Sequence, residues 1–336
     1  MIKQRTEKAG RIIISMADDA RGDDDEIFVY MGGNQQVPNG VRRARIHKSV
    51  KIVRANAFEN RRRLIYVEFH DGIEIIEEFA FCGCFLLSGA IKLLGVKIIK
   101  DSAFDYCYGV TDVEFGDRLE TIEMRAFHYC TSLTKIRMPT VRTIGRAAFG
   151  CCQVLTDVQC GGGLRTLHSF AFHYCPELKR IALPLNDGII GDNNIFYDCP
   201  KLRTVDIVGG THQTVASLHL ESWRNEMNNE INRINQVLPT FTHWHKTEEI
   251  QQWMTRVIDR LDLYKAEHHK LMMKEATTLL ELALWKANLD ENGGDRIDRE
   301  GVRVTRGSRK RARKEICVTS GADVVIKNVL PFLALK

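Results

Sequence analysis

The segment Leu133-Thr134-Lys135-Ile136-Arg137-Met138-Pro139 is followed by Val141-Arg142-Thr143-Ile144 and then by Ala148-Phe149-Gly150-Cys151-Cys152. This pattern of apolar residues occurs seven times, and each copy is marked by one phenylalanine. The markers are 22 to 24 residues apart: Phe58, Phe81, Phe104, Phe127, Phe149, Phe172 and Phe196. A period in the twenties, held over seven units, is typical of a solenoid and not of a closed globule.

Apolar residues recur at fixed distances from each phenylalanine. They stand eight and five residues before it, and six, nine and eleven residues after it; around Phe127 they are Leu119, Ile122, Leu133, Ile136 and Met138. Positions nine and eleven are two residues apart, so their side chains share one face of a strand. Lys92 and Cys160 depart from this pattern at position eleven. We expect each coil to combine one strand with one helical turn at Ala-Phe-x-x-Cys.

The segments quoted above resemble the BspA-type leucine-rich repeat, which reads Leu-x-x-Val-x-Phe/Leu-Pro, Val-x-x-Ile and Ala-Phe-x-x-Cys. The resemblance covers about half of the chain. It implies an α/β solenoid of about seven 23-residue repeats that acts as a protein-interaction scaffold, with no common chemistry. The resemblance also implies kinship with surface proteins of bacteria and with expanded sets in unicellular eukaryotes.

Changes in composition divide the chain into segments. We expect a flexible acidic segment at 1–26, an N-terminal cap or partial repeat at 27–49 and the solenoid at 50–210. A helical hairpin at 211–290, a basic linker at 291–316 and a short docked C-terminal segment at 317–336 are expected to follow. The cap is predicted from a strand at Ile27–Tyr30 and from Val41, Ala44 and Ile46, which lie one repeat length before Leu64, Val67 and Phe69.

The segment 211–290 has apolar residues at helical spacing. A first helix is indicated by Leu220, Trp223, Met227, Ile231, Ile234 and Leu238, and Pro239 ends it. A second helix, with Thr247 as its N-cap, is indicated by Ile250, Met254, Val257, Leu261, Tyr264, Leu271, Leu279 and Leu282. Its length leaves open one helix or two that break near His268-His269. The hairpin is expected to close the last coil, and a homodimer seam in 211–290 is the alternative.

Composition and charge restrict the class of protein. The 336 residues are 44% hydrophobic and 27% charged, with a net charge of +5, which is ordinary for a protein with a buried core. No apolar run approaches the roughly 18 residues of a membrane span. Residues 1–17 offer only Ile12–Ile14 as an apolar core, too short for a secretory signal. We therefore expect an intracellular protein, cytoplasmic or nuclear.

Six of the ten cysteines form a column in the repeat. They stand three residues after a marker phenylalanine: Cys84, Cys107, Cys130, Cys152, Cys175 and Cys199. Neighbouring members would lie roughly 5 Å apart, which is within reach of a disulfide. Because we expect an intracellular compartment, we expect small buried hydrophobic residues with free thiols instead.

The outward positions of the long strands are the candidate binding surface. They lie eight and ten residues after each phenylalanine; the candidates are Tyr66, Glu68, Asp112, Glu114, Lys135, Arg137, Asp157, Gln159, Arg180 and Asp206, and Gly89 and Ile91 hold these positions in the second repeat. One interpretation is a docking surface for a protein. The alternative is a ladder of internal ion pairs that joins Asp112 to Lys135, Glu114 to Arg137 and Asp157 to Arg180.

A basic segment lies near the C-terminal end. It contains Arg303, Arg306, Arg309, Lys310, Arg311, Arg313 and Lys314, without an acidic residue. It resembles a nuclear import signal read by an import receptor, a nucleic-acid-binding arm, or a solvated linker. No aromatic residue is interleaved with it, which argues against base stacking.

Chemistry at a metal or catalytic centre is not expected, and neither is a cofactor. His128 with Cys130 and His173 with Cys175 lie two coils apart, about 10 Å, which is too far for one tetrahedral zinc ion. There is no Gly-x-Ser-x-Gly elbow and no phosphate-binding loop, and Gly161-Gly162-Gly163 is expected to be a loop between coils.

The sequence thus predicts a non-enzymatic scaffold that binds an unidentified protein partner through the strand face of its solenoid. The first alternative is a nuclear, nucleic-acid-associated protein that acts through residues 303–314. A weaker alternative is a cell-surface adhesin.

Overall fold

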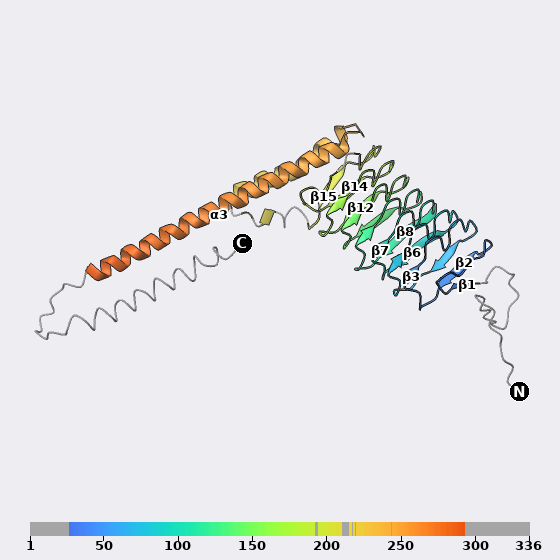
Figure 1. Ribbon diagram of the computed structural model, residues 1–336. Helices are drawn as coiled ribbons and strands as arrows, with labels where there is room; N and C mark the ends of the chain where they lie inside the picture. The colour runs from blue at the N-terminus through green and yellow to red at the C-terminus, as the bar shows by residue number, and fades with distance from the viewer. Residues whose placement is uncertain are drawn as a thin grey trace, which may run out of the picture. The chain divides into compact units, whose positions relative to one another are not determined.

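Two parallel sheets run along the repeats (Figure 1). The computed structural model describes residues 27–191, 194–209, 215–216, 218, 220–242 and 244–292. In this part of the chain each of the first six repeats contributes one longer strand and one two-residue strand, so the expected parallel-strand solenoid is confirmed.

The longer strands form a six-stranded sheet in the order β15-β14-β12-β10-β8-β6. Its strands are β6 (Ser88–Leu93), β8 (Gly109–Phe115), β10 (Lys135–Met138), β12 (Asp157–Cys160), β14 (Arg180–Leu183) and β15 (Thr204–Ile207). At the N-terminal end, β1 (Ile27–Tyr30), β2 (Arg43–Ile46) and β4 (Tyr66–Glu68) form a three-stranded parallel sheet. Ala44 pairs with Val67, as the repeat spacing predicts for a partial repeat.

The second six-stranded sheet is made of two-residue strands that hold the apolar position five residues before each phenylalanine. They are β3 (Ile52–Val53), β5 (Ile75–Ile76), β7 (Ile98–Ile99), β9 (Thr121–Ile122), β11 (Thr143–Ile144) and β13 (Thr166–Leu167). Each pairs in register with the next, for example Ile122 with Ile144.

The marker phenylalanines form the centre of the core. All seven are fully buried, and neighbouring rings are stacked with centroids 4.9 to 6.1 Å apart. These separations follow the roughly 4.8 Å spacing of adjacent strands. A single coil cannot bury its ring on both faces, so the column depends on stacking of the coils.

The Ala-Phe-x-x-Cys segment forms hydrogen-bonded turns, and the expected helical turn was wrong. Residues two before and two after the phenylalanine have left-handed backbone angles, such as Ser102 (φ 55°) and Tyr106 (φ 62°). Alternating angles turn every second N–H toward the next coil, where Ser102, Phe104 and Tyr106 donate to backbone carbonyls at 2.8, 2.8 and 2.9 Å. Bonds between coils therefore replace the bonds that a helix would make within itself.

A register shift between Gly89 and Ala90 corrects the expected surface of the second repeat. Gly89 adopts φ 84°, a left-handed angle, and at this point Thr111 of β8 is left out of the pairing with β6. As a result Ile91 is buried and Lys92 is exposed, the reverse of the prediction. The irregular Lys92 noted in the sequence is thus explained by the bulge.

The glycine run 161–163 lies in the loop that follows β12, as expected. A Cβ atom on Gly161 would stand 1.7 Å from the carbonyl oxygen of Pro139. Glycine is required there because the loop of one coil lies against the backbone of the preceding coil.

Two helices follow the solenoid: α2 (Glu221–Val237) and, after the short η2 (Leu238–Thr240), α3 (Lys246–Asn292). The helix α3 continues through His268-His269 without a break. Trp253 donates to the carbonyl of Glu230 at 3.1 Å, and the rings of Trp223 and Tyr264 stack at 4.9 Å, as a helical hairpin requires. Within the described residues, none of the helices is both long and apolar enough to cross a membrane.

Side chains of these helices cover the last coil. The hydroxyl of Thr247 accepts a hydrogen bond from the Phe196 N–H. In the earlier repeats the N–H of the marker phenylalanine donates instead to a backbone carbonyl of the next coil. Asn235 bonds both the N–H and the carbonyl of Val205, and Lys246 donates to the carbonyls of Pro200 and Leu202. The expectation that the hairpin closes the last coil is therefore confirmed. Thr247, expected as an N-cap of its own helix, instead bonds the end of the solenoid.

Candidate functional site

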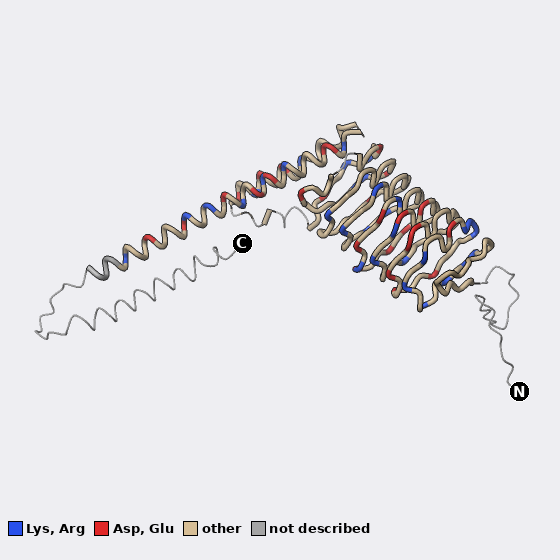
Figure 2. Tube along the Cα trace, in the orientation of Figure 1, with Lys and Arg blue, Asp and Glu red and all other residues tan. Residues whose placement is uncertain are grey.

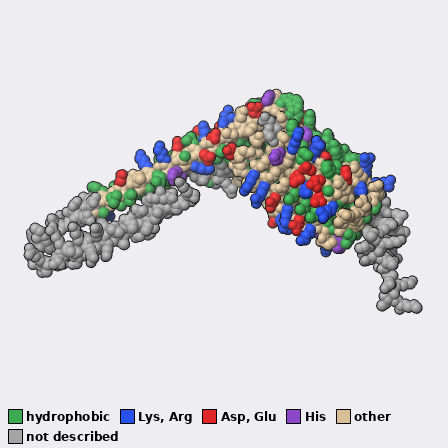
Figure 3. All heavy atoms as spheres, in the orientation of Figure 1, with side chains coloured by type: hydrophobic (Ala, Val, Ile, Leu, Met, Phe, Trp, Pro, Cys, Tyr) green, Lys and Arg blue, Asp and Glu red, His purple; other side chains and the backbone are tan. Residues whose placement is uncertain are grey.

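The ten candidate residues of the strand face lie at outward positions of the sheets. Each is exposed or half-buried, and its neighbours along the strand, such as Val113, Ile136 and Val158, are buried. Acidic and basic residues are interleaved along the coils (Figure 2). In the space-filling view both kinds gather on the face of the solenoid that is turned to the viewer (Figure 3).

The three ion pairs expected between neighbouring long strands are not formed. Glu114 pairs with Lys92 at 3.4 Å, and Arg180 pairs with Asp206. The carboxylates of Asp112 and Asp157 accept hydrogen bonds within their own strands, from the Val113 N–H at 2.9 Å and from the Gln159 amide at 3.0 Å. The prediction of a self-paired ladder was therefore wrong in its particular partners.

Lys135 and Arg137 remain exposed on β10 at the middle of the strand face. Among the described residues, neither side chain has an ion pair or a side-chain hydrogen bond. Their acidic neighbours are held elsewhere, as described above. Two exposed positive charges on one strand therefore remain available to a ligand.

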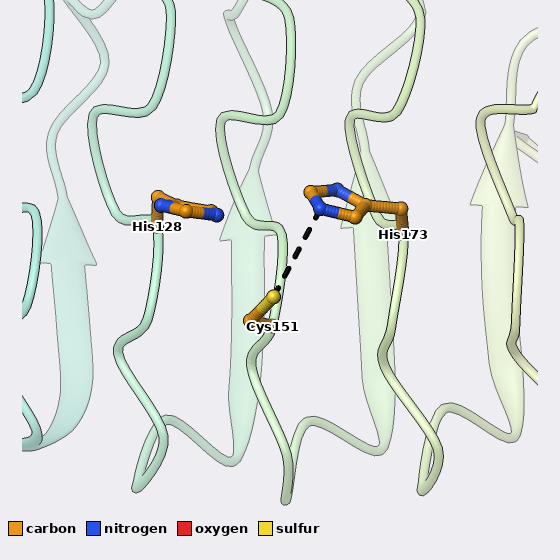
Figure 4. A group of neighbouring side chains, drawn as sticks. All are labelled: His128, Cys151 and His173. Atoms are coloured by element: carbon orange, nitrogen blue, oxygen red, sulfur yellow. Dashed lines mark hydrogen bonds between the residues drawn. The ribbon is translucent and has the colours of Figure 1, made fainter.

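A second cluster joins His128, Cys151 and His173, which come from three successive coils (Figure 4). One ligand atom from each lies within 4.8 Å of the others, and the Cys151 Sγ is 3.9 Å from the His173 Nε2. The sequence prediction grouped His128 with Cys130 and His173 with Cys175, which are buried column cysteines. It missed Cys151, which stands on the coil between them.

The approach of the two histidines is made possible by Gly150. Their ring centroids are 5.7 Å apart, much closer than the two coil spacings between their backbones suggested. A Cβ atom on Gly150 would stand 2.1 Å from His173 Cε1 and 3.0 Å from His128 Cδ2. The missing side chain of the middle coil thus leaves the space that both rings enter.

The Nδ1 atom of each histidine is already engaged. His128 Nδ1 donates to the buried carboxylate of Asp105 at 3.1 Å, and His173 Nδ1 donates to the Phe170 carbonyl at 2.7 Å. Because carboxylate and carbonyl oxygens only accept, both Nδ1 atoms carry the proton. In the neutral ring each Nε2 then has a free lone pair.

Charge and burial oppose each other at this cluster. Burial lowers the pKa of His128, but hydrogen bonds to Asp105 and Cys151 outweigh this effect and hold the pKa at about 8. Burial raises the pKa of the Cys151 thiol, but the interactions of the sulfur with His128 and His173 outweigh burial, so the pKa is lowered. The cluster therefore favours a thiolate.

The cysteine column differs from Cys151 in its contacts. Its thiols donate to backbone carbonyls of the phenylalanine column, for example Cys84 to Phe58 at 3.1 Å and Cys107 to Phe81 at 3.3 Å. Burial raises the pKa of Cys107 well above its ordinary value. The column cysteines thus pack in the core and do not face the histidines.

Aromatic side chains form an exposed edge beside the cluster, which the sequence analysis did not identify. Tyr106 stacks on Tyr129 at 5.0 Å, and Phe85 stacks on Tyr108 at 5.3 Å. Tyr106, Tyr108 and Tyr174 are each at least one-third exposed. The recurrence of tyrosine two residues after the marker phenylalanine was the signal that could have revealed this edge.

A basic hollow of 560 Å³ lies at the starts of the short strands β7 to β13. It is lined by Lys97, Arg118, Arg142 and Arg165, together with Asp117, Glu120, Thr140 and Gly163. The signal for it was the residue seven before each phenylalanine, which is charged in six successive repeats: Lys51, Glu74, Lys97, Glu120, Arg142 and Arg165.

Three predicted segments lie outside the described residues. They are the acidic segment 1–26, the basic residues 303–314 and the C-terminal segment 317–336. Their predicted roles, including nuclear targeting and nucleic-acid binding, stay predictions.

The solenoid of parallel strands with a phenylalanine core defines a leucine-rich-repeat protein. The chain belongs to the family described as BspA type leucine rich repeat region, whose model matches residues 40–139 and 97–222 with six copies. Members of such families generally serve protein interaction or are associated with surfaces. Among the curated proteins, none matches this chain.

Solved structures similar to this chain are bacterial leucine-rich repeat proteins. The protein of T. pallidum is 24% identical, with a TM-score of 0.36, over 53% of this chain and 72% of that chain. A protein from Bacteroides ovatus ATCC 8483 is 25% identical, with a TM-score of 0.39, over 52% and 42%. A leucine rich cell surface protein from Faecalibacterium prausnitzii A2-165 is 16% identical, with a TM-score of 0.23, over 57% and 93%.

Proposed function

We propose that this protein is a non-enzymatic scaffold that binds a protein partner through the strand face of its solenoid. The observation that carries this proposal is the exposed pair Lys135 and Arg137, whose charges are not used within the described part of the chain. The partner surface is expected to be acidic where it meets β10.

The sheet supports this use because its outward side chains are held in fixed register. Asp157 lies between Lys135 and Arg180 on adjacent strands, and Gln159 lies between Arg137 and Ala182. A rigid surface loses little conformational entropy on binding. Complementary charge raises the association rate and excludes partners of the wrong sign.

The test is affinity capture with mass spectrometry, comparing the full chain with Lys135→Glu/Arg137→Glu. Reversal of both charges should reduce recovery of the partner at least about tenfold, because like charges would then face each other. Lys48→Glu/Arg63→Glu is the matched control, since it changes the net charge equally at exposed turn residues outside the sheets. Equal recovery by both variants would overturn the proposal for this face.

A second variant tests the other exposed surface. Tyr106→Ala/Tyr174→Ala removes two side chains of the aromatic edge while the strand face stays intact. Partner loss in this variant alone would move the binding surface to that edge. A third sample that lacks residues 303–314 separates protein partners from those that require the basic segment.

We further propose that a second copy of the chain packs on the later part of α3. The early stripe residues Ile250, Met254 and Val257 are buried, whereas Leu271, Leu279 and Leu282 are 42%, 47% and 55% exposed. An apolar stripe on a helix gains stability when it is covered.

A further inference from the structure

We propose that His128, Cys151 and His173 bind a zinc ion in a site that spans three coils of the solenoid. Imidazole nitrogen and thiolate sulfur are common zinc ligands in proteins. The proposal concerns a different part of the molecule from the strand face and does not depend on the identity of a partner.

The ligand separations are close to those of a zinc site. Bond lengths of about 2.0 and 2.3 Å in a tetrahedral site place two ligand atoms about 3.3–3.6 Å apart. The Cys151 Sγ and His173 Nε2 are 3.9 Å apart, and all three ligand atoms lie within 4.8 Å. The ligand atoms would need to move by about an ångström to reach these separations.

The hydrogen bonds around the cluster orient the ligands. Metal-binding histidines usually donate their second ring N–H to a carboxylate or a backbone carbonyl. Asp105 and the Phe170 carbonyl supply both kinds of acceptor, and neither of them engages Nε2. The ring of His128 points toward the other two side chains, and the Cys151 sulfur faces the His173 ring (Figure 4).

The surroundings also suit a metal ion. The three ligand residues and Asp105 are buried or half-buried, so a bound ion would be largely shielded from water. Three protein ligands leave a fourth position for water or for a group from a partner.

The glycine at position 150 indicates that the approach of the two histidines is not incidental. The position one residue after the phenylalanine holds Glu59, Cys82, Asp105, His128, His173 and Tyr197 in the other repeats. Glycine occurs only between the two histidines, and any side chain there would enter the space of the His173 ring. The repeat is thus modified at the one coil where a site for an ion requires room.

The test uses the full chain, made metal-free under reducing conditions and titrated with Co²⁺, which reports thiolate ligation by its charge-transfer absorption. We expect one equivalent of Co²⁺ with that absorption, displaced by Zn²⁺. Cys151→Ala should abolish the absorption, and Asp105→Asn should weaken binding about 10–100-fold. Cys82→Ser and Cys317→Ser are thiol controls that should bind as the unmodified chain does.

Gly150→Ala provides the decisive comparison because it keeps all three ligands but displaces His173. Loss of tight Co²⁺ binding in this variant supports the assembled site. A charge-transfer band that survives in Cys151→Ala, or is absent from the unmodified chain, would overturn the proposal. Thermal unfolding in metal-free buffer checks that the variants fold. If a variant does not fold, His173→Gln is used in its place to remove one ligand. Zn²⁺ should raise the Tm of the unmodified chain and leave that of His173→Gln unchanged.

Discussion

At the scale of single residues, the repeat is a set of columns in which one position has one physical task. The phenylalanine column fills the core, and the cysteine column donates to the carbonyls beside it. Charged columns on the surface allow pairs between coils, such as Lys51 with Glu74 and Glu74 with Lys97. A residue that departs from its column, such as Gly150 or Lys92, therefore marks a local change in structure.

Glu123 gives a prediction at this scale. Burial, and then the charge of Asp101, raises the pKa of its carboxyl. A raised folded-state pKa means that the charged form is disfavoured by folding, so stability increases as the pH falls through that pKa. Glu123→Gln should increase the free energy of unfolding at about pH 7, by less than about 1 kcal/mol, and have no effect near pH 3.

Urea denaturation at the two pH values measures this change, with Glu74→Gln as the control of opposite sign. The hydrogen bond from Lys97 lowers the pKa of Glu74, so its contribution is present above the unfolded pKa and is lost in acid. Glu74→Gln should therefore destabilise the protein at about pH 7 only. An equal effect of Glu123→Gln at both pH values would contradict the argument.

At the scale of elements, the end of the solenoid is the point at which the repeat must be replaced by something else. The N–H of Phe196 and both backbone groups of Val205 have no further coil to bond. Thr247 and Asn235 supply these bonds from the two helices. The hairpin is thus a terminal cap, which solenoids require for solubility.

Thr247→Val tests this cap. The change keeps the shape of the side chain but leaves the buried Phe196 N–H without a partner, which should cost about 1–3 kcal/mol. Thr255→Val is the matched control, because Thr255 is exposed on the same helix and bonds only Gln251 of the preceding turn. It should change stability by less than about 0.5 kcal/mol. Equal losses in thermal or urea unfolding would show that the hydroxyl of Thr247 has no special role.

At the scale of the whole molecule, assembly depends on surfaces that the described chain leaves uncovered. On a helical wheel Leu271, Leu279, Leu282 and Trp285 fall within about 120° of one another. Trp285 is 64% exposed. Such a stripe is wide enough to form a seam with a second helix.

Sedimentation of the full chain and of two leucine variants tests the seam. Leu282 and Leu284 are similarly exposed, at 55% and 58%, but lie on opposite sides of the helix. We expect a dimer that Leu282→Glu converts to a monomer and Leu284→Glu does not, because only the first places a charge in the stripe. A monomeric unmodified chain would refute the proposed seam.

Much of this protein was determined by the sequence alone, because a solenoid repeats local spacing. The period of the phenylalanines predicted the coil, its core column and the outward strand positions, and the helical spacing of apolar residues in 211–290 predicted the change to helices. Such features depend on residues close in the chain and on the contact of each column residue with its equivalent in the next coil. They do not depend on contacts between side chains from different columns.

Only the tertiary structure decided the features that depend on contacts between unlike coils. The left-handed turns and the bulge at Gly89 are set by bonds to the next coil, so apolar spacing did not show them. The cluster of His128, Cys151 and His173 arises because two rings lean across a glycine, whereas strand spacing alone kept them apart. Backbone spacing fixes where each Cα lies, but the directions of the side chains decide which functional atoms meet.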